Sequence, residues 1–187
     1  MLLISEFLIC MTINLVFQYG LGISMLGRML RGKQNPFLLS VMVTVFCVYG
    51  AMVSYLLKPL WQWEGSLLIQ PLVYIIAAAI LYLLLLLLFA FFPEPIRKTL
   101  AAYLHQTAFS CIVMGCFLLT EQGVGSLQNA FVYGLRCGIG FLLAACVITF
   151  ANNRLNSEKM PRSTRGWPAV LIYAGVISLA LSCIKQN

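Results

Sequence analysis

The residues best suited to chemistry gather in one apolar segment, 105–119, with the sequence HQTAFSCIVMGCFLL. Cys111 lies near its middle and directly follows Ser110, at the end of a group of polar side chains. The other six cysteines also fall in apolar runs and form no CxxC pair, so we expect them to be small buried hydrophobes and not disulfide partners. Cys111 is the exception because of its position and its neighbours, which make it the candidate centre for chemistry inside the apolar region.

A shorter segment of similar character, 20–27, lies in the first half of the chain and contains Ser24 between Gly22 and Gly27. The apolar stretch around it continues to Leu30, which is too long for one straight span. We therefore expect this helix to break at the Gly20-Leu21-Gly22 sequence. Irregular backbone at such depth is tolerated only where it is buried in protein or lines a cavity.

The two segments belong to halves of similar organisation. Residues 128–131, QNAF, repeat residues 34–37, QNPF, and each copy follows the segment of its own half. Because the first and fourth apolar runs enter from opposite sides, the repeat indicates two inverted halves of three helices each, 1–92 and 93–187. In this architecture helices 1 and 4 are interrupted and a site forms between the halves at the membrane midplane.

The composition shows what must position these segments. Of the 187 residues 61% are hydrophobic and 9% are charged, too few charges to cover a globular surface, so lipid must be the solvent. A span takes roughly 20 apolar residues. Six runs are long enough, which predicts an all-α integral membrane protein with six transmembrane helices at 2–26, 37–57, 67–92, 100–119, 127–150 and 167–184. Aspartate is absent and no Walker motif, zinc spacing or Ser/His/Asp set occurs, so self-contained soluble-type catalysis is not expected.

The basic residues predict the orientation in the membrane. Nine of the twelve Lys and Arg residues lie in alternate loops, between runs one and two, three and four, and five and six. The positive-inside rule then places both termini outside the inner (plasma) membrane of a bacterial or archaeal cell. The formal charge of +7 is dispersed over helix ends, so nucleic-acid binding is not expected.

Three polar positions inside the runs allow two interpretations each. Asn14 and Gln18 share one helical face, where they serve either interhelical packing or function. His105 either packs near the interface, which we favour, or relays protons. Arg136 either extends its side chain to the outer interface or neutralises an anionic centre in the interior.

Residues along the second half resemble the Rnf/Nqr family of membrane subunits, in particular the A-type subunits of Rnf electron-transport complexes. The resemblance extends over the whole chain in span count and topology, but its identities are concentrated from residue 111 onward. In run six and its approach these are Pro161, Arg165-Gly166, Leu171-Ile172, Ala174-Gly175 and Ser178-Leu179-Ala180; in run five, Tyr133-Gly134, Gly140-Phe141 and Arg154-Leu155; upstream, Cys111 with Val113 to Gly115, and Asn14 with Leu21-Gly22.

The resemblance implies a subunit of an ion-translocating oxidoreductase, a translocase component that carries electrons across the bilayer coupled to Na⁺ or H⁺ movement. In that family a sister subunit of opposite orientation packs alongside, and each subunit supplies two cysteines to a shared two-iron, two-sulfur (2Fe-2S) cluster. The ligand positions correspond to Cys111 and Ser24 here, with Asn14, Gly22, Gly27, Ser110 and Gly115 as supporting residues. Ser110 stands where the family has asparagine.

Ser24 departs from the family pattern, because thiolates are the usual iron-sulfur ligands and a hydroxyl is far less acidic. Three explanations follow: Ser24 ligates as an alkoxide in an altered cluster, a cysteine such as Cys137 replaces it, or the cluster is absent. Cys10 lies too far along the helix to substitute. Two other functions stay open: a redox-inactive Rnf/Nqr paralogue, and the six-helix substrate-binding subunit of a vitamin transporter, which composition fits equally well.

Overall fold

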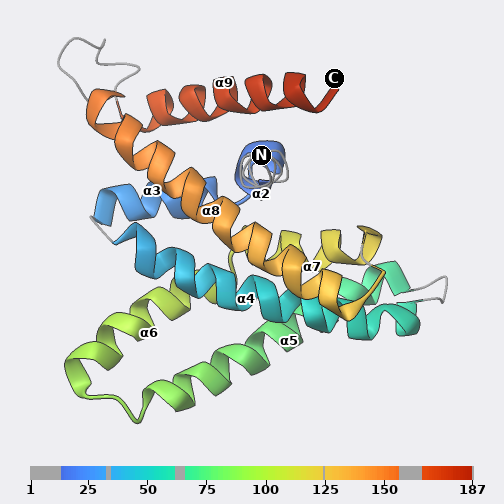
Figure 1. Ribbon diagram of the computed structural model, residues 1–187. Helices are drawn as coiled ribbons and strands as arrows, with labels where there is room; N and C mark the ends of the chain where they lie inside the picture. The colour runs from blue at the N-terminus through green and yellow to red at the C-terminus, as the bar shows by residue number, and fades with distance from the viewer. Residues whose placement is uncertain (1–13, 33–34, 62–65, 124, 156–165, 187) are drawn as a thin grey trace.

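The computed structural model describes residues 14–32, 35–61, 66–123, 125–155 and 166–186, and within them the chain is all-helical (Figure 1). The elements in order are α2 (Leu15–Tyr19), α3 (Ile23–Gly32), α4 (Pro36–Leu57), the short 3₁₀ helix η1 (Lys58–Trp61), α5 (Ser66–Phe89), α6 (Glu94–Ala108), α7 (Cys111–Gly123), α8 (Leu127–Leu155) and α9 (Trp167–Gln186). The first part of the predicted run one, including Cys10, lies outside the described residues.

Three helices, α4, α5 and α8, are long and apolar enough to cross a membrane, and α6 with α7 forms a fourth such unit that is bent by 52°. The apolar part of α9, Trp167–Cys183, is shorter, and α2 and α3 are separated by a break. Among the described residues the structure thus supports three or four membrane-capable units. The count of six spans stays a prediction.

Local sequence explains where the helices begin. α4 starts at Pro36, directly after an extended Asn35. Proline fits the first helical turn because an N–H group there makes no hydrogen bond within the helix, so its absence costs nothing. α6 starts at Glu94, not at residue 100 as predicted, since Pro95 again occupies the first turn and a polar turn precedes the apolar part. Pro71 lies inside α5, within the predicted run three. The run of leucines in α5 is largely exposed, as expected for a lipid-facing helix.

The helix ends that neighbour the basic loops lie on one side of the molecule. In Figure 1 the C-terminal ends of α3, α5 and α8 and the N-terminal ends of α4, α6 and α9 are all at the left. The opposite ends of α4, α5, α7 and α8 and the end of α9 are at the right. The described helices therefore separate the predicted basic loops from the other loops.

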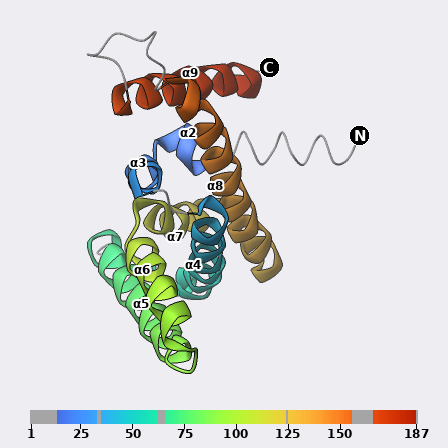
Figure 2. The ribbon, with the colours of Figure 1, turned by 90° about the vertical axis from the view of Figure 1, so that its left-hand side faces the viewer.

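The central pair of the fold is α4 and α8, which lie side by side through the molecule (Figures 1 and 2). Two glycines four residues apart on α8 allow the backbones to touch. A Cβ atom added to Gly134 would lie 2.6 Å from the Cα of Val48, and one added to Gly138 would lie 2.7 Å from the Cα of Thr44. Small residues at this spacing are a common device for close helix packing in membranes.

We predict opposite effects for alanine at two helical glycines. Gly138→Ala should lower the free energy of unfolding by about 1–3 kcal/mol, because the added methyl group meets the α4 backbone. Gly175→Ala on α9 meets nothing within 4 Å and should raise it by up to about 1 kcal/mol through helix propensity. Thermal unfolding of the purified membrane protein measures both, and equal shifts for the two variants would contradict this packing.

Candidate functional site: two helix breaks that meet

The first break lies between α2 and α3, where the sequence predicted it. Gly20 has φ +69° and Gly22 has φ +85°, left-handed conformations that side chains other than glycine rarely adopt. The N–H of Gly20 caps α2 by donating to the carbonyl of Leu15. The chain then starts afresh as α3, with Ser24 in its first turn.

The second break lies at Phe109 and Ser110, between α6 and α7, and confirms the predicted interruption of this span. Phe109 leaves the helical conformation with φ −110° and ψ +32°, and α7 then begins at Cys111. The carbonyl of Ser110 accepts hydrogen bonds from the N–H groups of Val113 (3.1 Å) and Met114 (3.2 Å), which start the new helix. Cys111 is therefore the first residue of a half-helix, as Ser24 is the second residue of another.

The two breaks pack against each other. A Cβ atom added to Gly22 would lie 3.5 Å from the Cβ of Ile112, and one added to Gly115 would collide with the side chain of Leu21. Gly22, at the first break, thus packs against a residue of α7, and Gly115, on α7, packs against a residue of the first break. From this contact α3 and α7 run in opposite directions, α3 toward the left and α7 toward the right of Figure 1.

Ser24 and Cys111 are both exposed. Each lies in the first turn of a half-helix, where the helix dipole and the free N–H groups favour a negatively charged ligand. Within the described residues no group of three or more His, Cys, Asp and Glu side chains could hold a metal ion.

Two buried polar atoms near Cys111 have no partner among the described residues. They are the hydroxyl oxygen of Ser110, a residue that is 6% exposed, and the side-chain nitrogen of Gln106 one helical turn earlier. Buried polar groups are nearly always hydrogen-bonded, so each exception needs an explanation. A polar or charged group bound next to Cys111 would supply one.

Asn14 ties the first break to the centre of the fold. Its Nδ2 donates a 2.7 Å hydrogen bond to the carbonyl of Gly140 on α8, and its Oδ1 accepts one of 3.0 Å from the N–H of Val16. It is 1% exposed, whereas Gln18 is exposed. The geometry supports the packing interpretation for Asn14: one amide caps α2 and fastens it to α8.

The other residues singled out from the sequence are not part of the Gly22–Ile112 and Gly115–Leu21 contacts. Gly27 packs on the indole of Trp167, and Cys137 is buried in α8, so it does not share the exposed face of Cys111. His105 lies in the last turn of α6, close to the break. The predicted run four began at residue 100, but α6 begins at Glu94, so His105 is farther from the helix start than the run indicated. Its Nδ1 is 2.7 Å from the hydroxyl of Tyr82 on α5. Arg136 is half-buried on α8.

Sequence spacing could not reveal which residues of the other half Asn14, Gly22 and Gly115 contact, namely Gly140, Ile112 and Leu21. The Asn14–Gly140 bond joins residues 126 positions apart, and its acceptor is a backbone carbonyl that every residue carries. The one available signal is the clustering of glycine on α8, at 134, 138 and 140. Such clustering indicates that another helix packs closely there, but it does not identify that helix.

We predict that Asn14→Ala lowers the free energy of unfolding by about 1–3 kcal/mol, because it removes a buried interhelical hydrogen bond and a helix cap together. Asn14→Ser keeps an acceptor for the N–H of Val16 and should recover about 1 kcal/mol of that loss. Chemical or thermal unfolding of the purified protein separates the two contributions. Identical stability of both variants would mean that the cap adds nothing.

Comparison with known proteins places the whole chain in one family. The family model for the Rnf-Nqr subunit, a membrane protein, matches residues 4–186. The A-type subunit of the ion-translocating oxidoreductase complex of Glaesserella parasuis serovar 5 is 30% identical over 145 residues, 74% of this chain and 73% of that protein. The E-type subunit of the Na⁺-translocating NADH-quinone reductase of Psychromonas ingrahamii is 26% identical over 105 residues, 56% of this chain and 52% of that protein. The A-type subunit of the Na⁺-translocating ferredoxin:NAD⁺ oxidoreductase complex of Acetobacterium woodii is 24% identical over 112 residues, 60% of this chain and 58% of that protein.

The last two relatives are matched over little more than half of their length, whereas the family model extends over nearly all of this chain. All three names denote subunits of larger oxidoreductase assemblies. The chain is thus a member of the Rnf-Nqr family of membrane-protein subunits, the family that its sequence pattern resembles.

Proposed function

We propose that this chain is a membrane subunit of an ion-translocating oxidoreductase complex, and that Cys111 and Ser24 are its contribution to an iron-sulfur centre shared with a sister subunit of opposite orientation. The names of the relatives support the first part, since each denotes a subunit of an ion-translocating or Na⁺-translocating oxidoreductase. The second part rests on the geometry of the two breaks.

The observation that carries the proposal is the contact of Gly22 with Ile112 and of Gly115 with Leu21. It brings the first turns of α3 and α7 together while both donor residues stay exposed. A two-iron cluster needs four protein ligands, and Cys111 and Ser24 would supply two of them. A second chain that presents a matching pair would complete the set and cover the exposed donors.

The donor set fits such a centre well at Cys111 and less well at Ser24. A thiolate at a helix N-terminus is a common iron ligand, whereas a serine hydroxyl must lose a far less acidic proton to serve. When bound, the cluster would supply one-electron transfer. The chain's own residues would hold it: Ile112, the neighbour of Cys111, packs on Gly22, and the hydroxyl of Ser110, which has no partner among the described residues, could donate a hydrogen bond to a charged group beside Cys111.

The same proposal includes an inverted repeat with both chain ends on the less basic side. Its supports are the opposite directions of α3 and α7, the matching positions of α4 and α8 after the two breaks, and the position at one end of the molecule of the helix ends that adjoin the basic loops in sequence (Figure 1). In inverted repeats, broken helices meet near the midplane of the bilayer. A centre there would lie about halfway across the barrier that electrons must cross.

Ser24 favours one second candidate, a paralogue that keeps the fold and has lost the redox centre. Such a protein would stabilise the assembly without carrying electrons. The vitamin-transporter function, which composition alone allowed, has no support now that the chain belongs to the Rnf-Nqr family.

We predict that Cys111→Ala removes about two iron atoms per chain and the matching electron paramagnetic resonance signal from the reduced, purified complex. Cys183→Ala is the matched control, because that cysteine is also exposed but lies on α9, away from the breaks. Loss of iron in both variants would point to damage of the assembly, and loss in neither would contradict ligation by Cys111.

A second prediction distinguishes the two candidates. If Ser24 is a weak ligand of a working centre, Ser24→Cys should raise iron retention during purification and shift the resonance signal, since a thiolate replaces an oxygen donor. If the natural complex lacks this iron but Ser24→Cys acquires it, the chain is a paralogue that lost its centre. Absence of the iron from both proteins would contradict the electron-transfer role.

A further inference from the structure

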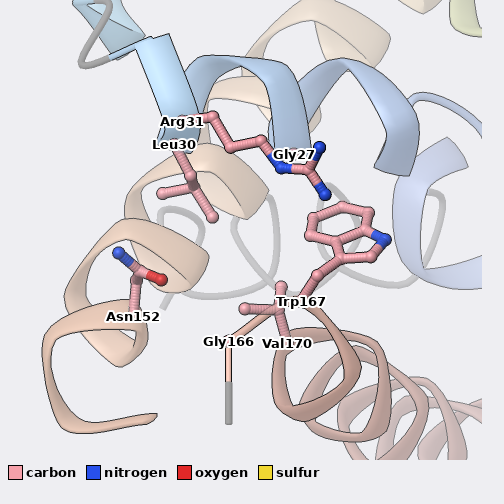
Figure 3. Close-up of a pocket in the computed structure, with 7 residues that line it drawn as sticks. All are labelled: Gly27, Leu30, Arg31, Asn152, Gly166, Trp167 and Val170. Carbon is pink, nitrogen blue, oxygen red and sulfur yellow. The ribbon is translucent and has the colours of Figure 1, made fainter. Parts of the chain in front are cut away.

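A cavity of about 310 Å³ lies between the C-terminal part of α3, the end of α8 and the start of α9 (Figure 3). Its lining combines polar and apolar side chains. Arg31 and Leu30 come from α3, Asn152 from α8, and Trp167 and Val170 from α9, with Gly166 at the rim. The volume is at the low end of the range for small-molecule sites, which suits a headgroup better than a nucleotide.

The polar part of the lining is suited to an anion. Figure 3 shows the Arg31 guanidinium extending over Gly27 toward the indole of Trp167, with the Asn152 amide on the other side of the cavity. None of the lining residues carries a carboxylate, and among the described residues the ion pairs of Glu94 involve Arg97 and Lys98, not Arg31. Guanidinium and amide groups carry N–H donors, and phosphate oxygens accept hydrogen bonds from such groups.

The start of α9 adds to this preference. Gly166 has φ +91° and its carbonyl accepts a 3.2 Å hydrogen bond from the N–H of Val170, so the first turn of a 20-residue helix begins at the cavity rim. The positive end of a helix dipole favours negative charge. The N-terminal end of α9 and the guanidinium of Arg31 thus both favour a negatively charged group in this cavity.

The apolar part of the lining points to a lipid. Leu30 and Val170 are the aliphatic members of the lining, and elsewhere on the first turns of α9 Leu171 and Ile172 are 43% and 61% exposed. Acyl chains can lie on this apolar outer surface of α9 near the cavity. A soluble phosphate compound would gain nothing from that surface.

We propose that this cavity binds the phosphate of an anionic membrane lipid, with Arg31 as its main charged contact. Its position agrees with such a role, because the cavity lies where α3 and α8 end, next in sequence to two of the basic loops, and a tryptophan begins α9. Basic residues and tryptophan are both typical of the membrane–water interface. The lipid would hold α3, and with it the first break, against α8 and α9.

Gly27 keeps the tryptophan in place. A Cβ atom added there would lie 2.6 Å from Cζ3 of Trp167, so any larger residue must displace the indole that forms one side of the cavity. The close contact between α3 and α9 explains why this position of α3 is glycine. It gives Gly27 a role in lipid binding and not at the two breaks.

The test uses the purified complex in neutral nanodiscs with a trace of phosphatidylglycerol that carries a photoreactive group on its acyl chain. Mass spectrometry then locates the crosslinks. We expect labelling of the first turns of α9, and a loss of about fivefold in Arg31→Gln, the factor that corresponds to about 1 kcal/mol for one basic contact. Arg28→Gln is the matched control, because Arg28 is exposed one turn earlier on α3 and does not line the cavity.

Competition identifies the occupant. Unlabelled phosphatidylglycerol should reduce the labelling, whereas equal amounts of phosphatidylcholine or millimolar inorganic phosphate should not. Equal losses of crosslinking in Arg31→Gln and Arg28→Gln would show that only the general surface charge matters, and would overturn the proposal. So would effective competition by phosphatidylcholine, which would show no charge preference, or by inorganic phosphate, which would indicate a soluble phosphate compound. None of these measurements depends on iron.

Discussion

The fold depends on the contact between two helix breaks, where the side chain of Ile112 packs against Gly22 and that of Leu21 packs against Gly115. A break frees backbone polar groups that lipid cannot satisfy, so it survives in a membrane only where protein surrounds it. Each break here provides part of the surroundings of the other. The left-handed Gly20 and Gly22, the cap from Asn14 and the restart of the chain at Cys111 are all consequences of that arrangement.

The long helices hold the breaks in register. α4 and α8 touch along the glycines of α8, and the hydroxyl of Ser54 on α4 donates a 2.8 Å hydrogen bond to the carbonyl of Phe117 on α7. Asn14 fixes α2 to α8 in the same way through the carbonyl of Gly140. Both broken units are thus attached to one central helix pair by a buried side chain that bonds to backbone, an interaction that costs little entropy in short polar residues.

The sequence predicted those parts of the fold that rest on local backbone chemistry. Glycine at 20 and 22 marked the first break, because glycine adopts left-handed conformations that other residues rarely reach. Pro36 marks the start of α4, because its ring fixes φ and its missing N–H is not needed in the first helical turn. The start of α6 was predicted too late, since apolarity reports the hydrocarbon region and not the helix, and the first turns of α6 are polar. The second break was expected from Cys111 and its polar neighbours, although Phe109 and Ser110 are not conformational breakers.

The candidate site was predicted only as residue types, because what unites Ser24 with Cys111 is a tertiary contact between their neighbours. Two exposed donors at the starts of opposed half-helices cannot by themselves bind a four-ligand centre. The chemistry of this protein would then belong to an interface and not to the chain alone. Under the proposed function a partner chain supplies the remaining ligands, which is consistent with the exposure of both donors.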